Sequence, residues 1–391
     1  MEERSSMSHH EVWELEIEVM TPVLVRRQQE VKVSKNDIKQ YEEYRSEILK
    51  KGNLNIKMYQ SGNSQASQFP DFPFFLYSGN KYLPYLPATA IKGAIRTAVI
   101  SEVLSNNLEA LKAYVKRISK LSDGHRRRIR PSAALELFAL CGKINPVPGE
   151  NLEPLWDPFG ALRFETGAAF ESIEKIKFKR IYVTENHPKM LRQEKFHALP
   201  IRLTSKCRVV LDFALLKRAE GNFKKAMEEK KKNDEEIDIL ENCGFDYLKD
   251  MNRIIEACRN HAERIIEFER DKLLSGKNAE EYGEWKRALN ELEKKQKDEN
   301  SFLLPVGAGC GWMSKTMGVL LYTIGENKDK KRPWEIVKRF VELEPWKRQL
   351  LRSRNPNLKG RFHICFPRTK TLAEVRSNFY PPGWILVNVK K

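Results

Sequence analysis

The sequence lacks the patterns of a disulfide-stabilised, zinc-binding or membrane-spanning protein. Its six cysteines form no C-x-x-C pair, so we expect reduced, intracellular thiols and neither a zinc ribbon nor a disulfide framework. No apolar run approaches the length of about 18 residues that a transmembrane helix needs. The charged N-terminal segment has no apolar core of the kind that secretory signals carry. The seven histidines are scattered, so we predict no metal site and no cofactor. Together with the other absences, this predicts a cytoplasmic protein without membrane contact.

What the sequence has is a large and uneven positive charge. The 391 residues are 41% hydrophobic and 10% aromatic, as in a globular protein, and carry a net charge of +17. Residues 328–391 hold 17 Lys and Arg against 5 Asp and Glu, a net charge of +12, whereas residues 220–300 hold 17 against 22, a net charge of −5. A basic surface of this kind suits a polyanion such as RNA. We therefore expect polyanion binding outside the acidic middle.

A glycine-rich stretch, PVGAGCGWMSKTMG at 305–318, is the most distinctive local motif. Because glycine has no Cβ, successive N–H groups of such a loop can point toward one phosphate, and the following lysine and threonine can add a charge and a hydroxyl. A tight β-turn with a bulge is the simpler alternative. The candidate phosphate-binding residues are Gly307, Gly309, Gly311, Lys315 and Thr316.

The same stretch also invites comparison with a nucleotide-binding P-loop. Residues 309–316 match that motif except that Ser314 stands in place of its last glycine. The next segment, MGVLLYTIG, is short and apolar with glycines near both ends, which predicts a strand instead of a phosphate-holding helix. The apolar run that ends in Asp212 lies upstream, which is the wrong order for a magnesium-binding partner strand. A P-loop NTPase is therefore the weaker interpretation.

A second candidate phosphate site lies at the start of a predicted helix. Apolar residues recur at helical spacing over 91–99, and Thr89 is a suitable N-cap. Lys92 then takes the third helical position, where Glu or Gln would complete a capping box and where a cation opposes the helix dipole. A bound anion would remove this conflict; the alternative is an exposed lysine at small energetic cost. Gly93 and Arg96 complete this candidate site.

Two further segments are candidates for function. Residues 112–130 hold eight Lys and Arg against one Asp, a density that fits phosphate contact better than a solvated helix face. The candidate RNA-binding residues there are Arg126, Arg127, Arg128 and Arg130. The long polar segment 26–80 is either a functional loop or a solvated excursion.

Periodicity predicts the remaining elements. A strand is predicted at 13–19, where four apolar residues alternate with three glutamates. Apolar stripes at 248–265 and around Trp285 predict two helices in the acidic middle, which we assign to packing and protein partners. Further strands are predicted at 161–165, 175–185, 206–216, 361–366 and 384–389.

Five segments, taken in order, resemble the RAMP superfamily of CRISPR proteins: LEIEVMTPVLV, LPATAIKGAIRTA, DPFGALRFETG, GAGCGWMSKTMG, and FPRTKTL followed by PPGWILVNV. The motif GCGWMSKT and the terminal GW strand are most similar to the fifth-subunit type of type III-A (Csm) effector complexes. The resemblance spans nearly the whole chain. One departure is Glu165-Thr166-Gly167, which follow LRF where the family would have Asp, so a role tied to that carboxylate is not carried over.

The resemblance implies an α+β fold of two ferredoxin-like (RRM-like) domains. The first is expected at 12–200, with a long loop at 26–80 and a basic helical insert at 106–145. The second is expected at 201–391, with a helical insertion at 220–300. The family's glycine-rich loop and helix-start phosphate site map onto the two candidate sites named above.

The resemblance also implies a non-catalytic, RNA-binding role in antiviral defence. The subunit would cap the 3′ region of the CRISPR RNA, support RNA maturation and contact neighbouring Csm subunits, with a host nuclease as a further partner. The runner-up is a metal-independent endoribonuclease, which needs a general base and acid near the 2′-OH. His187 and His197 flank a basic stretch and are the candidates for that chemistry; the alternative is that they are surface or hydrogen-bonded histidines. Neither predicted phosphate site contains a histidine, which argues against cleavage.

Overall fold

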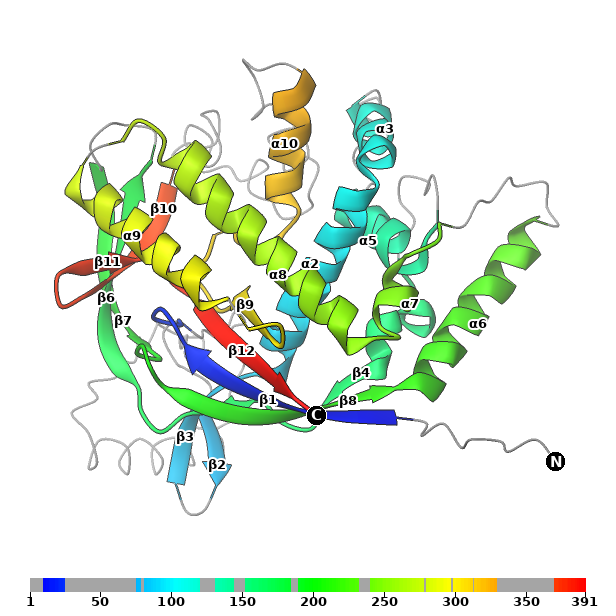
Figure 1. Cartoon of the computed structure of the whole chain (residues 1–391), viewed down its shortest axis with the longest axis horizontal. Coiled ribbons are helices and arrows are strands. Elements are labelled where there is room, and N and C mark those ends of the chain that lie inside the picture. The colour runs from blue at the N-terminus through cyan, green and yellow to red at the C-terminus, as the bar shows by residue number, and fades with distance from the viewer. Residues whose placement is uncertain are drawn as a thin grey trace, which may run out of the picture.

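The structure is a computed structural model with helices packed on one side of a curled antiparallel sheet (Figure 1). It describes residues 10–24, 75–78, 81–119, 131–143, 152–183, 189–231, 240–277, 279–296, 298–311, 313–328 and 369–391. The strands are β1 His10–Val19, β2 Phe75–Ser78, β3 Lys81–Leu86, β4 Leu162–Phe164, β5 Ala168–Ala169, β6 Glu174–Tyr182, β7 Lys189–Ala198, β8 Thr204–Asp212, β9 Ser301–Pro305, β10 Thr369–Val375, β11 Asn378–Tyr380 and β12 Trp384–Lys390. The α-helices are α2 Ala88–Asn106, α3 Leu108–Ser119, α5 Pro131–Cys141, α6 Phe213–Lys231, α7 Gly244–Tyr247, α8 Met251–Glu267, α9 Glu280–Lys295 and α10 Gly318–Lys328. Shorter helical turns are η1 Pro154–Trp156, η2 Pro158–Ala161, the π-helical η3 Phe268–Leu273 and η4 Met313–Lys315. No helix in these ranges is long and apolar enough to cross a membrane.

The central sheet has five strands in the order β4-β8-β1-β12-β9, and the paired strands are antiparallel. β1 is the middle strand. Leu15, Ile17 and Val19 are buried on one of its faces, and the alternating glutamates on the other face are half-buried. The predicted strand at 13–19 is confirmed. On the exposed face, Lys206 contacts both Glu14 at 2.7 Å and Glu16 at 3.2 Å. The acidic side of β1 is therefore partly neutralised by its neighbour β8.

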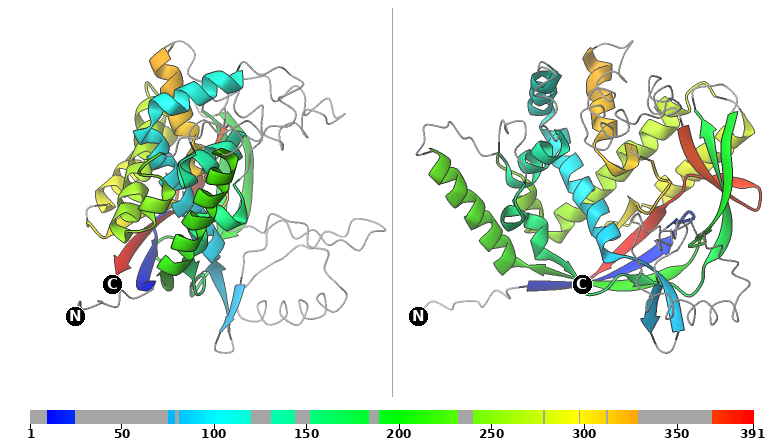
Figure 2. Two further views of the ribbon diagram at one scale, coloured as in Figure 1. Left: turned by 90° about the vertical axis from the view of Figure 1, so that its right-hand side faces the viewer. Right: turned by 180° about the vertical axis from the view of Figure 1, so that it is seen from behind.

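A second sheet has the order β11-β10-β6-β7, and Figure 2 shows β6 and β7 curving away from the central sheet toward β10. Its apolar side forms a small core in which Ile176 and Phe178 pack with Leu24 and Ala373. A third, small sheet joins β2, β3 and β5. The β2–β3 hairpin projects on the side of the central sheet away from the helices (Figures 1 and 2).

The helices of the acidic middle are part of the main core. α8 packs against α2 and β9, and its buried side chains include Ile254, Ile255 and Ile265. Trp285 and Leu289 of α9 are fully buried. The two predicted helices are confirmed, and their contacts show that this segment stabilises the fold.

Several sequence predictions are wrong in detail. The segment predicted as a strand after the glycine-rich stretch is α10, in which Leu320, Leu321 and Ile324 are buried at helical spacing. Short apolar runs do not distinguish strand from helix by periodicity. The strand predicted at 206–216 ends at Asp212, because the Asp212 carboxylate accepts the Leu215 N–H and α6 begins. Strands β2, β3, β5, β7, β9, β10 and β11 were not predicted, and the predicted strand at 361–366 lies outside the described residues.

The predicted boundary at 200/201 does not separate two sheets. The central sheet takes β1 and β4 from before this boundary and β8, β9 and β12 from after it. One large buried cluster runs through the sheet and the helices on both sides of the boundary. The mixed helix and sheet fold is confirmed, while the division into two ferredoxin-like domains stays a prediction.

Candidate nucleic-acid interface

The glycine-rich loop follows β9 and has a backbone that requires glycine. Gly307, Gly309 and Gly311 have φ angles of +77°, +93° and +90°, a region that side chains with a Cβ rarely adopt. A Cβ on Gly307 would lie 2.7 Å from the Leu24 carbonyl oxygen. These backbone angles explain the glycines at all three positions, and phosphate binding by the loop stays a prediction.

Hydrogen bonds fix the first half of the loop to two other segments. The Ala308 N–H donates to the Leu24 carbonyl at 2.6 Å, and the Val306 N–H donates to the Gly383 carbonyl at 2.6 Å. The Cys310 thiol lies 2.8 Å from the Val306 carbonyl. Gly311, in contrast, is exposed. The second half of the loop is therefore the part that can meet a ligand.

A buried charged cluster contacts the glycine-rich loop on the side that faces the protein interior. Glu269, 1% exposed, lies in η3, where the Leu274 N–H donates to the Glu269 carbonyl in the i to i+5 pattern of a π-helix. Its carboxylate pairs with Lys370 and accepts a hydrogen bond from Trp285 Nε1 at 3.1 Å. Lys370 Nζ also donates to the Cys310 carbonyl at 3.1 Å. This cluster therefore connects the loop to the helical insertion and to β10.

The end of the loop leads into α10. The Ser314 hydroxyl is buried and lies 3.4 Å from the Glu269 carboxylate, so Ser314 faces the interior. Thr316 Oγ1 accepts the Gly318 N–H at 3.1 Å and so caps the start of α10. The side chain of Lys315 lies outside the described part of the structure.

The geometry does not match a P-loop, although the prediction that a strand and not a helix follows the loop was wrong. A helix does follow the loop, but it begins at Gly318, after η4, and not directly at the loop. β9 is an edge strand of an antiparallel sheet, whereas nucleotide-binding loops of this type connect a strand of a largely parallel sheet to a helix. Ser314 points into the protein, so this position cannot approach a phosphate.

The start of α2 differs from the prediction by two residues. Pro87, not Thr89, is the N-cap: it has an extended backbone, and its carbonyl accepts the Ala90 and Ile91 N–H groups. Proline cannot supply a side-chain cap, and none is present. Lys92 therefore lies in the second turn, where the helix dipole acts weakly. The predicted conflict between Lys92 and the dipole is correspondingly smaller.

The α2 candidates still share one side of the helix. Thr89 and Gly93 are exposed, and Lys92 is partly buried. Burial lowers the pKa of Lys92, the nearby Asp157 carboxylate opposes this shift, and the Arg96 charge adds to it. A Cβ on Gly93 would meet no atom within 4 Å, so the surface above this residue is open. An anion could therefore approach the backbone at Gly93 beside the Lys92 ammonium.

Arg96 makes structural contacts. Its guanidinium donates to both Asp157 carboxylate oxygens at 2.7 and 2.8 Å and to Glu136 at 2.8 Å. It also lies 5.5 Å from the centre of the Phe159 ring. Burial would lower the pKa of Arg96, but the two carboxylates outweigh it and raise that pKa. Arg96 joins α2 to α5 and η2, and its proposed RNA contact would have to share the guanidinium with these carboxylates.

Arg126, Arg127, Arg128 and Arg130 lie outside the described residues. His187 does as well, while His197 lies on β7 directly opposite Lys175 of β6. His261 of α8 is fully buried, and burial lowers its pKa to about 3, so it is neutral at physiological pH. No described histidine lies in the glycine-rich loop or on α2.

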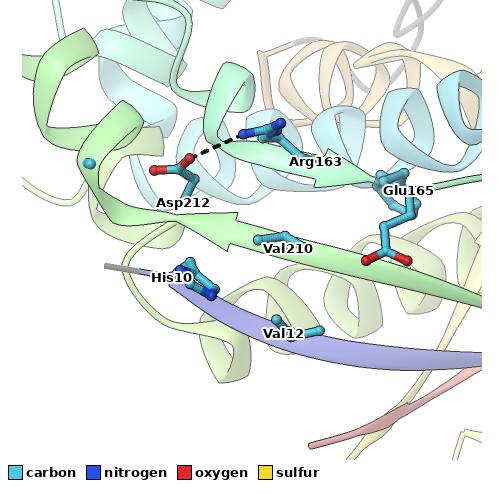
Figure 3. A pocket seen from close by; sticks show the side chains of 8 residues that line it. His10, Val12, Arg163, Glu165, Val210 and Asp212 are labelled. Atoms are coloured by element: carbon cyan, nitrogen blue, oxygen red, sulfur yellow. Dashed lines mark hydrogen bonds and ion pairs between the residues drawn. The ribbon is translucent and has the colours of Figure 1, made fainter. Parts of the chain in front are cut away.

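A hollow of about 680 Å³ opens on the exposed face of the central sheet (Figure 3). It is lined by apolar residues of β1 and β8 and by Glu165, the residue at which the sequence departs from the RAMP pattern. Glu165 lies 3.5 Å from Arg208, and Asp212 lies 3.4 Å from Arg163. Each of these carboxylates therefore has an arginine as its partner at the edge of the hollow. Sequence reasoning did not predict this hollow, because its walls come from three separate strands.

Comparisons with known proteins identify a curated protein of similar sequence. No family model matches this chain. A curated protein of Methanocaldococcus jannaschii, described as "CRISPR system Cms protein Csm5", is 28% identical over 315 residues, which cover 80% of this chain. The chain is thus similar in sequence to a Csm5 protein over most of its length. The match covers 63% of the length of that Csm5 protein.

Two solved structures match nearly the whole chain. A chain of a cryo-EM structure titled as a Csm–crRNA–target RNA ternary complex of a type III-A CRISPR–Cas system matches 96% of this chain and 100% of its own length. Its TM-score is 0.54 at 16% sequence identity. A crystal structure of T. onnurineus Csm5 matches 95% of this chain and 99% of its own length, with a TM-score of 0.47 at 15% identity. The first match shows a shared fold with a chain of a Csm complex.

Proposed function

We propose that the chain is an RNA-binding, non-catalytic subunit of a type III-A Csm effector complex. It would cap the 3′ region of the CRISPR RNA and support RNA maturation in antiviral defence. The kinship with Csm5 and the shared fold with a chain of a Csm–crRNA complex support this proposal. Neighbouring Csm subunits, including an adjacent RAMP subunit, and a host nuclease are the proposed protein partners.

The observation that carries the proposal is the supported glycine-rich loop. Hydrogen bonds from Val306 and Ala308 fix one end of its left-handed backbone, and the Glu269–Lys370 cluster contacts the loop at Cys310, next to the exposed Gly311. A preorganised backbone loses little conformational entropy when it binds a phosphate. We assign the direct RNA contacts to Gly309, Gly311, Lys315 and Thr316, with Gly307 positioning the loop.

The open side of α2 is the second proposed contact. Thr89, Lys92 and Gly93 would meet a phosphate, while Arg96 keeps the helix in position through its carboxylate partners. The cluster of Arg126, Arg127, Arg128 and Arg130 is a further proposed contact, from its charge alone.

Two matched glycine substitutions test the α2 contact. Gly93 in α2 and Gly283 in α9 both lie inside helices, and a Cβ at either would meet no atom within 4 Å. Replacing either by Ala should therefore stabilise the fold by about 0.5–1 kcal/mol. We expect only Gly93→Ala to weaken binding of a fluorescein-labelled, repeat-containing RNA in fluorescence anisotropy. Equal RNA affinity of both variants would remove α2 from the interface.

A companion assay tests the loop and the absence of cleavage. Gly309→Val places a Cβ 3.1 Å from the Pro382 ring at a φ of +93°, so RNA affinity should fall sharply. Lys315→Ala should reduce the slope of log affinity against log salt by about 0.7. The labelled RNA should stay intact with and without EDTA. Cleavage that persists in EDTA and is lost in His197→Ala would favour the endoribonuclease instead.

A further inference from the structure

The β6–β7 hairpin carries a row of lysines on one face. Alternate residues of a strand share a face, so Lys175, Lys177 and Lys179 of β6 lie on the same side. In the antiparallel register Lys177 is directly opposite Lys195 of β7. These four lysines are called the lysine face. Ile176 and Phe178 point to the other side, into the small core beneath Leu24.

One carboxylate is in contact with this face. Glu374 of β10 lies 2.9 Å from Lys177 and 3.0 Å from Lys179. Burial alone would raise the pKa of Glu374, but the two lysines outweigh it and lower that pKa. Lys179 also lies 4.5 Å from the centre of the Phe379 ring. Lys177 and Lys179 are thus partly neutralised, and the positive charge concentrates on Lys175 and Lys195, which are exposed.

Glu374 offsets only part of the positive charge on the lysine face. Like charges directly opposite one another on paired strands destabilise a sheet, and Lys177 and Lys195 are such a pair. Lys175 adds a third cation two residues along the same face. Alternate strand residues lie about 6.8 Å apart, a spacing comparable to that of successive phosphates in a nucleic-acid strand. A polyanion laid along the hairpin would therefore turn a repulsive cluster into an attractive one.

Toward β10, the side of the sheet that carries the lysine face becomes buried. In the register of β10 and β6, Lys370, Leu372 and Glu374 share the side that carries Lys177 and Lys179. Lys370 bonds to the Cys310 carbonyl in the glycine-rich loop. Leu372 is 1% exposed and Lys370 is 9% exposed, so the accessible part of this side is the part that carries Lys175 and Lys195.

We propose that the lysine face binds the phosphate backbone of the RNA, as a second contact beyond the glycine-rich loop. This inference rests on the proposed RNA-binding function. The competing explanation is that lysines on the edge strand β7 prevent pairing with another chain. An acidic protein is a different occupant, and the test below separates all three.

The test compares two double substitutions with the same change in charge. Lys175→Gln with Lys195→Gln neutralises the lysine face, and Lys217→Gln with Lys225→Gln neutralises two exposed lysines of α6. Anisotropy of labelled single-stranded RNA is measured at several salt concentrations. The lysine-face variant should lose about 1.4 from the slope of log affinity against log salt and bind at least roughly tenfold more weakly near 0.1 M salt. The α6 variant should match the wild type.

Three outcomes would overturn the proposal. Unchanged RNA binding by the lysine-face variant, with new aggregation in light scattering, would assign the lysines to edge protection. Unchanged RNA binding with lost binding to polyglutamate would assign the face to an acidic protein. Equal loss in both double variants would show a non-specific charge effect. If the wild type binds RNA and Gly309→Val abolishes binding, the proposed function stands whatever the lysine face does; a wild type that binds no RNA refutes both.

Discussion

Replacing Lys370 by Met should destabilise the protein more than any single surface charge change. Lys370 is 9% exposed and pairs with Glu269, whose side chain is 2% exposed. Removing one partner of a buried ion pair leaves an uncompensated charge and typically costs about 3–5 kcal/mol. Glu269 would keep its hydrogen bonds from Trp285 and Ser314, which places the expected loss toward the lower end, about 3 kcal/mol. The loop would also lose the bond from Lys370 to the Cys310 carbonyl.

A double-mutant cycle measures this coupling. Glu269→Gln keeps an oxygen for Trp285 Nε1, so the Glu269→Gln, Lys370→Met double variant should recover about 1–3 kcal/mol relative to the sum of the single variants. Urea unfolding followed by circular dichroism gives the free energies. Lys249→Met, which removes an exposed lysine that contacts Asp246 and Glu220, serves as the control and should cost about 1 kcal/mol or less.

Lys370→Met should also change RNA affinity, which is measured by the anisotropy assay described above. Because the cluster positions the loop, Lys370→Met should also weaken RNA binding under conditions in which the variant remains folded. A cost no larger than that of Lys249→Met, or a double variant no better than the sum of the singles, would refute the reasoning that the cluster supports the loop.

Three further predictions concern the same framework. Gly383→Ala, at a φ of +91° and with its Cβ in collision with Cys310 Sγ and the Val306 carbonyl, should cost at least about 2 kcal/mol in urea unfolding; a neutral effect would mean that the loop is not packed as described. Removing residues 226–299 should abolish cooperative thermal unfolding, because α8 and α9 fill the core, and a cooperative melt would contradict this packing. His261 stays neutral in the fold down to a pKa of about 3 but ionises near 6.5 when unfolded, so protons favour unfolding as pH falls. Between pH 7.5 and 5 this histidine should cost the wild type about 2 kcal/mol, and His261→Leu should have a flatter stability profile; parallel profiles would argue against a buried neutral histidine.

Sequence periodicity predicted the elements whose burial is one-sided. β1 alternates apolar residues with glutamates, and α8 carries an apolar stripe at helical spacing, so both were predicted correctly. α10 was mistaken for a strand because its buried face covers most of a short apolar segment. β7 was missed because its charged residues interrupt the apolar ones without regular alternation, and an edge strand requires few apolar residues.

The site was predictable only where the signal is local. The glycines of the loop are required by local backbone angles, so the sequence alone identified them. The support beneath the loop joins Glu269 to Lys370, which are 101 residues apart, and no local pattern reports such a contact. The carboxylate partners of Arg96 lie 40 and 61 residues away, which is why its structural role was not predicted. The lysine face, in turn, depends on the strand register, which the sequence did not give because β7 was missed.

The most direct test of the proposed RNA site is a crosslinking map. RNA carrying 4-thiouridine is irradiated with the full chain, and the crosslinked peptides are identified by mass spectrometry. The account predicts crosslinks in residues 306–316 and 87–96, with none in α6. Crosslinks confined to α6 or to the exposed face of β1 and β8, or no crosslinks at all, would contradict it.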